Sequence, residues 1–198
     1  MDCKKALTET NGDMDAAVDV LKKSGAAKME KKQSRIAAEG IARVAVNGNV
    51  AVVAEVNSET DFVAKNETFQ EFVQTVADTA LASDLNGGAN GEDIDALLAT
   101  NGLSDLLVEK TATIGEKLSV RRFAKVTGDA VASYIHGGGR IGVVIAADGA
   151  SDDAAKEALT NIAMQVAAMN PQYISRNDIS AEELAKIKEI TIDSALND

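Results

Sequence analysis

The chain has 198 residues, and its 31 Asp and Glu against 20 Lys and Arg give a formal net charge of −11. Hydrophobic residues make up 45%, which supplies a packed core and excludes wholesale disorder, whereas four Phe, two Tyr and no Trp leave aromatic side chains scarce. Such a surface argues against direct nucleic-acid binding, because phosphates need basic partners and bases need rings to stack on.

Targeting signals and membrane spans are not predicted. No run approaches the ~20 apolar residues of a membrane helix. The first residues lead into an amphipathic helix instead of the apolar run of a signal peptide. The single cysteine, Cys3, cannot form an internal disulfide, so a cytoplasmic location is expected. Its position on the apolar side of that helix favours a small buried residue over a nucleophile.

Two short N-terminal helices are predicted in residues 1–25. Asn11-Gly12 separates them, Asp13 is placed to cap the second helix, and Ser24-Gly25 is placed to end it. A pair of this size buries too little surface to stand alone, so it needs either another helix or support from the rest of the chain. Residues 26–40 read as a basic helical connector.

A β-hairpin follows, with strands over 41–46 and 50–56 joined by the turn Asn47-Gly48-Asn49, because Asn-Gly between apolar runs is a strong hairpin signal. The next helix carries an apolar stripe, formed by Phe69, Phe72, Val73, Val76 and Ala80. Residues 84–102 are rich in Gly, Asn and Asp and predict a surface excursion around one short helix over 94–99.

The second half repeats the first. A shift of 91 residues places Gly48 on Gly139, Val52-Val53 on Val143-Val144, and Asp61 on Asp152. The order of turn, strand, junction and helix is shared, which predicts an α+β fold with two related antiparallel-sheet and helix subdomains, over 41–127 and 128–198. Near the end, Ser180 to Glu183 form a predicted capping box for a last helix.

Enzyme signatures are mostly absent from the sequence. There is no phosphate-binding loop, nucleophile elbow or zinc-ligand set, so we predict no catalytic residues, no metal and no cofactor. The glycines 137–139 precede a strand and not a helix, so they predict a hairpin turn and not a phosphate cradle.

Phe62, in the segment Thr60-Asp61-Phe62-Val63, stands out from this background. In the second repeat its counterpart is Asp153, which suggests a solvent-facing position, and an exposed Phe beside an Asp is typical of an anchor for a protein partner. Isolated Phe residues are usually buried, so a core position remains an equal alternative. His136 has Ala45 as its counterpart, so the fold does not require the imidazole.

Several segments together resemble bacterial elongation factor Ts: residues 1–7, Glu55-Val56-Asn57, Thr60 to Lys65, and Tyr134 to Gly142. The resemblance implies a guanine-nucleotide exchange factor for elongation factor Tu that acts by binding both the GDP-bound and the nucleotide-free partner. It also implies that 1–25 is part of a helical domain similar to ubiquitin-associated domains.

The resemblance also implies roles for individual residues. Thr60, Asp61, Phe62 and Val63 correspond to the segment that displaces Mg²⁺ from Tu, with Phe62 as a wedge. Further partner contacts are expected at Lys4, Ile114 and His136.

The resemblance implies a further segment before residue 1, and longer members of the family continue past Asp198 with a dimerisation region that shorter members lack. The chain is therefore expected to be truncated at both ends, with a naturally short member as the alternative. Two other functions remain open: a Tu- or ribosome-associated relative that binds without exchange, and an α+β enzyme with a deep pocket of converging titratable groups.

Overall fold

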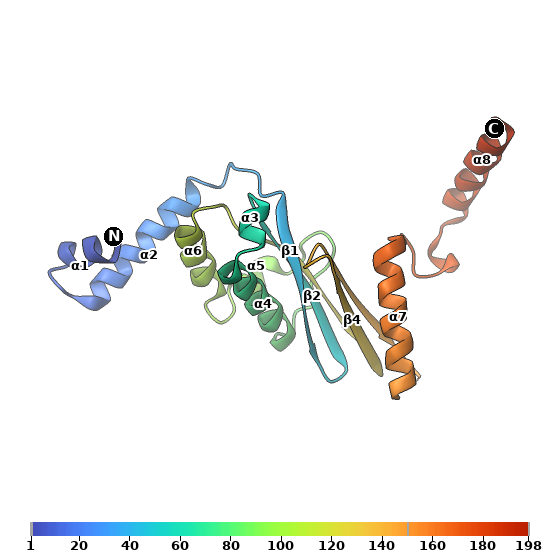
Figure 1. Cartoon of the computed structure of the whole chain (residues 1–198), viewed down its shortest axis with the longest axis horizontal. Coiled ribbons are helices and arrows are strands. Elements are labelled where there is room, and N and C mark those ends of the chain that lie inside the picture. The colour runs from blue at the N-terminus through green and yellow to red at the C-terminus, as the bar shows by residue number, and fades with distance from the viewer. Residues whose placement is uncertain (1, 150, 198) are drawn as a thin grey trace. The chain divides into compact units, whose positions relative to one another are not determined.

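The computed structural model describes residues 2–149 and 151–197, with the side chain of residue 197 left out. The chain forms two compact units, Met1–Ala167 and Ala168–Asp198. Helices and antiparallel strands alternate along it, which confirms the predicted α+β class (Figure 1). The elements are α1 Asp2–Glu9, α2 Met14–Glu30, β1 Glu39–Asn47, β2 Val50–Ser58, α3 Asp61–Ala64, α4 Glu67–Ala82, α5 Ile94–Leu98, α6 Leu103–Ile114, β3 Ser119–Thr127, β4 Ala130–His136, β5 Ile141–Ala147, α7 Asp153–Met169, the 3-10 helix η1 Arg176–Asp178, and α8 Ala181–Asn197.

The N-terminal helices pack against the rest of the first unit, through the contact of α2 with α6. Asp13 caps α2 as predicted, with its carboxylate accepting the Ala16 N–H at 3.0 Å. The predicted helix end at Ser24-Gly25 is wrong, because α2 continues to Glu30. Gly25 is buried, and a Cβ there would lie 3.0 Å from the Val108 Cγ1 of α6, so this glycine lets the two helices approach closely. The connector is therefore helical only as far as Glu30.

Strands β1, β2 and β3 form an antiparallel sheet with β2 in the centre. The predicted hairpin is confirmed, since Asn47 pairs with Val50 around a turn in which Gly48 has a φ of 59°. Side chains alternate between the two faces of this sheet. The face that carries Val52, Ala54 and Val56 is buried.

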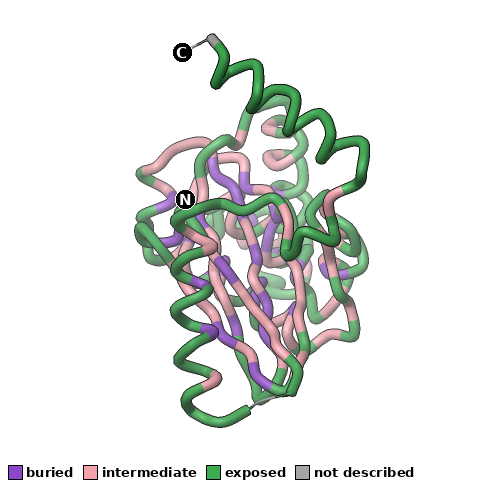
Figure 2. Tube along the Cα trace, turned by 90° about the vertical axis from the view of Figure 1, so that its right-hand side faces the viewer, coloured by how far each residue is buried: buried purple, intermediate pink, exposed green. Residues whose placement is uncertain are grey.

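Helix α4 covers that face. The predicted apolar stripe is confirmed, because every member is at most 1% exposed: Phe69, Phe72, Val73, Val76 and Ala80. Asn66 caps the helix by accepting the Phe69 N–H at 3.3 Å. Figure 2 shows the buried residues concentrated in the strands and the helices against them.

The β4–β5 hairpin packs on the opposite face of the three-stranded sheet. A Cβ on Gly142 of β5 would lie 2.8 Å from both the Ala42 Cβ and the Val53 Cγ2, so glycine allows the two sheets to touch. The Ala42 N–H of β1 also donates to the Gly139 carbonyl in the hairpin turn, at 2.7 Å. The first unit therefore contains stacked sheets, with α4 on the outer side of one of them (Figure 1).

Helix α7 covers the outer side of the β4–β5 hairpin. Leu159 packs with Ala130 and Ala132 of β4, so the hairpin-then-helix order predicted by the repeat is present in the second half as well. The stripe is weaker than in α4, since Ile162 is 49% exposed. The three glycines 137–139 form the hairpin turn with φ values of 59°, 70° and 108°, as predicted. The domain limits at residues 25, 40 and 127 stay predictions.

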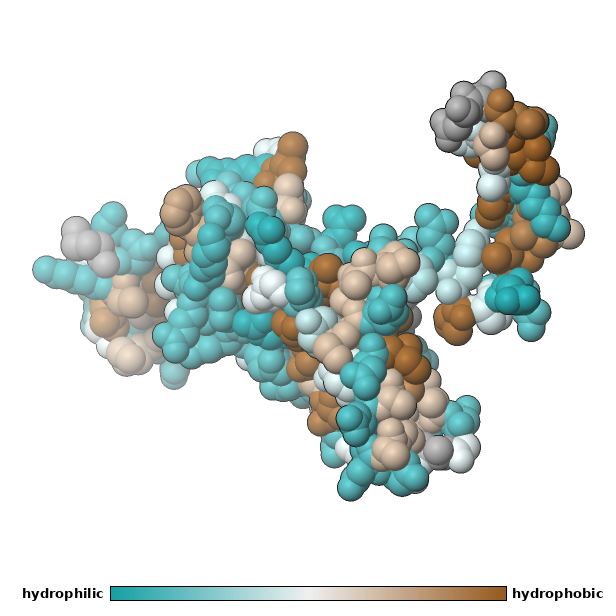
Figure 3. Space-filling view, turned by 45° about the vertical axis from the view of Figure 1, so that its right-hand side comes forward, coloured by the Kyte–Doolittle hydropathy of each residue, from teal (hydrophilic) through white to brown (hydrophobic). Residues whose placement is uncertain are grey.

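The second unit contains α8, which is exposed along its described length (Figure 2). Ser180 accepts the Glu183 N–H at 3.2 Å, which is half of the predicted capping box, while the Glu183 carboxylate accepts the Tyr173 hydroxyl. Figure 3 shows exposed apolar side chains along this helix, and they include Leu184, Ile187, Ile190, Ile192 and Leu196. Within the part of the chain that the structure describes, no helix is long and apolar enough to cross a membrane.

Candidate functional site

The segment after β2 forms a small exposed tip, which we define as residues 60–63. Thr60 caps the four-residue helix α3, with its hydroxyl oxygen accepting the Val63 N–H at 3.4 Å. Ala64 is buried and Val63 packs partly against the core, whereas Phe62 is 82% exposed. The core alternative for Phe62 is therefore excluded, and the tip holds a large apolar side chain in solvent.

Asp61 stands beside Phe62 and is ionised at neutral pH. Its carboxylate forms an ion pair with Lys65, one helical turn later, at 2.7 Å. The hydrogen bond and the charge of Lys65 hold the pKa of Asp61 below its ordinary value. The tip therefore presents an apolar ring next to a charged carboxylate. The ion pair of this carboxylate with Lys65 is exposed to solvent, so it is weak and other groups can compete for the carboxylate.

The tip is held from behind by the loop after α6. Gly115, at a φ of 88°, ends that helix directly after Ile114, and Glu116 then reaches the tip. The Glu116 carboxylate accepts the Thr60 hydroxyl at 2.7 Å and the N–H groups of Glu59 and Thr60 at 3.1 and 3.0 Å. Ile114 is half-buried against the core and lies two positions before Glu116 in the chain.

Sequence reasoning missed Glu116. Its carboxylate meets Thr60 across 56 positions of sequence, so no local spacing connects the two residues. The available signal was indirect: an acidic residue directly after a helix-ending glycine has no helical role of its own.

His136 lies at the end of β4 and is exposed, with its Nδ1 3.0 Å from the Tyr134 hydroxyl. The turn that follows it is bonded to β1 through Ala42, and β1 pairs with β2, whose end carries the tip. His136 is therefore connected to the tip through β1 and β2, and its side-chain hydrogen bond goes to Tyr134 and not to the tip.

Lys4 is exposed on α1, which packs on α2 and lies apart from α3 (Figure 1). Cys3 on the same helix is exposed, so the expectation that it is a small buried residue is wrong. Ala6 is the residue of α1 that turns inward, since it is 2% exposed. An eight-residue helix that packs on a single neighbour has room to bury only a narrow strip, which leaves Cys3 outside.

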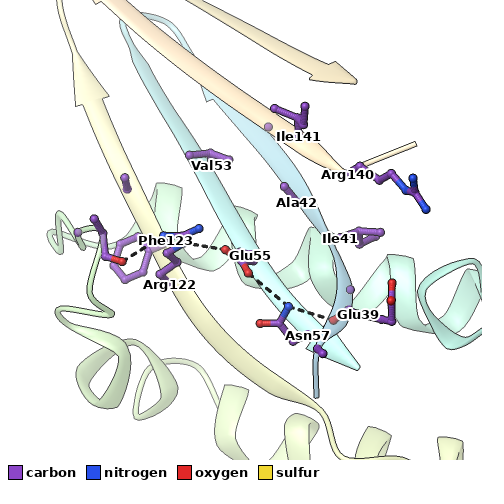
Figure 4. A pocket seen from close by; sticks show the side chains of 17 residues that line it. Glu39, Ile41, Ala42, Val53, Glu55, Asn57, Arg122, Phe123, Arg140 and Ile141 are labelled. Carbon is purple, nitrogen blue, oxygen red and sulfur yellow. Dashed lines mark hydrogen bonds and ion pairs between the residues drawn. The ribbon is translucent and has the colours of Figure 1, made fainter. Parts of the chain in front are cut away.

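A cleft of about 550 Å³ lies where the β4–β5 hairpin leaves the end of the three-stranded sheet uncovered, and we call it the sheet cleft. Glu55 in its floor pairs with Arg122 at 2.6 Å and with Arg121 at 3.6 Å. The Asn57 amide donates to Glu55 at 3.3 Å and to the Glu39 carbonyl at 2.9 Å, so the polar groups form one connected chain (Figure 4).

The chemistry available in the sheet cleft is limited. The described residues that line it include no Ser, Thr, Cys, His, Lys or Tyr. Its acidic floor residue is already held by two guanidinium groups. The titratable side chains among the described lining residues are those of Glu39, Glu55, Arg122 and Arg140.

The tip presents an exposed aromatic side chain on an α+β scaffold, an arrangement that is typical of protein-binding surfaces. The chain belongs to the elongation factor Ts family, because the family model described as "Elongation factor TS" matches residues 59–198, which is more than half of the chain. This is a family of elongation factors of protein biosynthesis that act as exchange factors. The matched range contains the tip, Ile114 and His136, and it does not contain Lys4.

Proposed function

We propose that this chain binds elongation factor Tu, in its GDP-bound and nucleotide-free forms, and promotes GDP release by disturbing the Mg²⁺ and nucleotide site. The observation that carries the proposal is the tip itself, in which Phe62 is 82% exposed beside an ionised Asp61. Membership in an exchange-factor family supports this role for the tip. The work is done by binding, and no covalent step is needed.

The mechanism follows from linkage. A partner that binds nucleotide-free Tu more tightly than GDP-bound Tu weakens GDP binding by the same factor. Burying a phenylalanine side chain stabilises a complex by about 2 kcal/mol. If that contact forms only in the nucleotide-free state, it corresponds to roughly a 30-fold weakening of GDP. Disturbing the Mg²⁺ is effective because the ion neutralises phosphate charge.

In this proposal each predicted residue has a separate part. Phe62 is the wedge and Asp61 acts on the Mg²⁺ site, while Thr60 and Val63 hold the helical turn that carries them. Ile114 and His136 add contacts from the core, and Lys4 adds one from the N-terminal helices.

The test is the release rate of a fluorescent GDP analogue from Tu. Phe62→Ala and Asp61→Ala should each slow release at a saturating concentration of the chain. Ile162→Ala is a matched control, because that side chain is also an exposed apolar group but lies on α7. Unchanged acceleration by both tip variants would refute the wedge.

The same assay separates exchange from binding alone. A chain that captures Tu in a pull-down and leaves the GDP release rate unchanged would be the binding-only relative. No structural observation favours that alternative over exchange.

A further inference from the structure

Two carboxylates cross-link the segment before the tip to the loop after α6, in opposite directions. Glu116 accepts three hydrogen bonds from the tip side, from the Glu59 N–H, the Thr60 N–H and the Thr60 hydroxyl. In the other direction, the Glu59 carboxylate accepts a hydrogen bond from the Lys117 backbone N–H. Neither contact belongs to a helix or a sheet ladder, and both lie just beyond the Asn57–Ser119 pair at the end of the β2–β3 ladder.

The connector between α2 and β1 is tied to the same place. The Lys117 ammonium donates to the carbonyls of Gln33 and Arg35, at 2.6 and 2.9 Å. The Arg35 guanidinium in turn lies 3.3 Å from the Glu59 carboxylate. Three segments distant in sequence therefore meet behind the tip.

The helix that carries Phe62 needs this support. A helix of four residues is far below the length at which helices are stable by themselves. Its N-cap is Thr60, whose hydroxyl donates its proton to Glu116 and accepts the Val63 N–H with its oxygen. Glu116 thus orients the group that caps the turn, and hydrogen bonds in such a chain reinforce one another.

We propose that Glu116 is a positioning residue, which fixes the tip so that Asp61 and Phe62 meet the partner already ordered. The proposal rests on the function proposed above. A preordered tip avoids the loss of conformational freedom that ordering it on binding would require. Glu116 itself does not need to touch the partner.

A local fluorescence measurement tests the physical half without any partner. The chain has no Trp, so Phe62→Trp introduces a single indole at the tip. In that background, Glu116→Ala should enlarge the fast component of the anisotropy decay, while Glu116→Gln should restore part of the order. The Gln carbonyl oxygen can still accept the two backbone N–H groups.

Glu92→Ala is the matched control. Glu92 is also a carboxylate that holds a loop, since it accepts the Asn90 N–H at 2.9 Å and the Asn90 side-chain amide at 3.1 Å. It lies in the 84–102 segment and should leave the decay at position 62 unchanged. Far-UV circular dichroism of each variant confirms that the fold is retained.

The exchange assay tests the functional half with Phe62 in place. Glu116→Ala removes three hydrogen bonds to a carboxylate, and it should lower the saturating rate of GDP release by at least about tenfold, which is the scale set by losing one of them. The chain concentration that gives half-maximal release should change much less. Glu116→Gln should recover a measurable part of the rate.

Two results would overturn the positioning role: an unchanged anisotropy decay in Glu116→Ala, or a mobile tip with a wild-type release rate while Phe62→Ala is slow. A different result points at the proposed function instead. If Phe62→Ala and Glu116→Ala both release GDP at the wild-type rate, the wedge fails, and the anisotropy decay decides by itself whether Glu116 orders the tip.

Discussion

Phe62 and Phe72 are ten residues apart, and the same substitution should destabilise the protein far less at Phe62 than at Phe72. Phe62 is 82% exposed, so less than a fifth of its surface is in contact with the chain, whereas Phe72 on α4 is 1% exposed. Full burial of a phenylalanine stabilises by up to about 3 kcal/mol, so removing the Phe62 ring should cost about 0.5 kcal/mol. Phe72→Ala should cost about 3 to 5 kcal/mol, because it leaves a cavity.

Urea denaturation followed by far-UV circular dichroism measures both values in one buffer. The expected result is a small shift of the midpoint for Phe62→Ala and a large one for Phe72→Ala, with similar slopes. A loss above about 2 kcal/mol in Phe62→Ala would mean that its ring is packed in solution, and the exposed anchor would be refuted.

Three further predictions concern the scaffold. Gly142→Val should lower the free energy of unfolding by about 1 to 3 kcal/mol, since its Cβ would lie 2.8 Å from the Val53 side chain; thermal melts would show this, and an unchanged melting temperature would contradict the close contact of the sheets. Asn66→Ala removes the α4 cap and should cost about 1 kcal/mol, whereas Asn66→Asp keeps an acceptor for the Phe69 N–H and should cost less in the same melts. The hydrogen bond from the Lys117 N–H holds the pKa of Glu59 below its ordinary value of 4.5. The stability that this carboxylate contributes is therefore complete above about pH 4.5 and is lost as the pH falls through the lowered pKa. Glu59→Gln should flatten the pH dependence of the urea midpoint, and an equal pH dependence in both proteins would contradict this prediction.

Much of the fold was predictable because its signals are local. The Asn47-Gly48 turn and the apolar stripe that begins at Phe69 each depend on residues within one turn or one helix, and both predictions are confirmed. The exposure of Phe62 was predictable only as one of two alternatives. Its counterpart in the repeat indicated solvent, but the general behaviour of phenylalanine indicated burial.

The features that the sequence did not predict share a physical cause: each depends on contacts between segments that are far apart in the chain. Gly25 looks like a helix end, yet Val108 of a helix 83 positions later packs against it and the helix continues. Glu116 looks like a loop carboxylate until the tip is placed against it. The sheet cleft depends on where the β4–β5 hairpin packs on the three-stranded sheet. The sequence repeat predicted that hairpin but not the residues of the sheet that it contacts.

The exposed thiol of Cys3 makes this chain convenient for single-site labelling. It is the only cysteine, and it stands in solvent on α1, so a maleimide dye attaches at one known point without any background mutation. With an indole introduced at position 62, the two probes would report the distance between the N-terminal helices and the tip. Such a pair could follow, in real time and during nucleotide exchange, whether the helices and the tip move together.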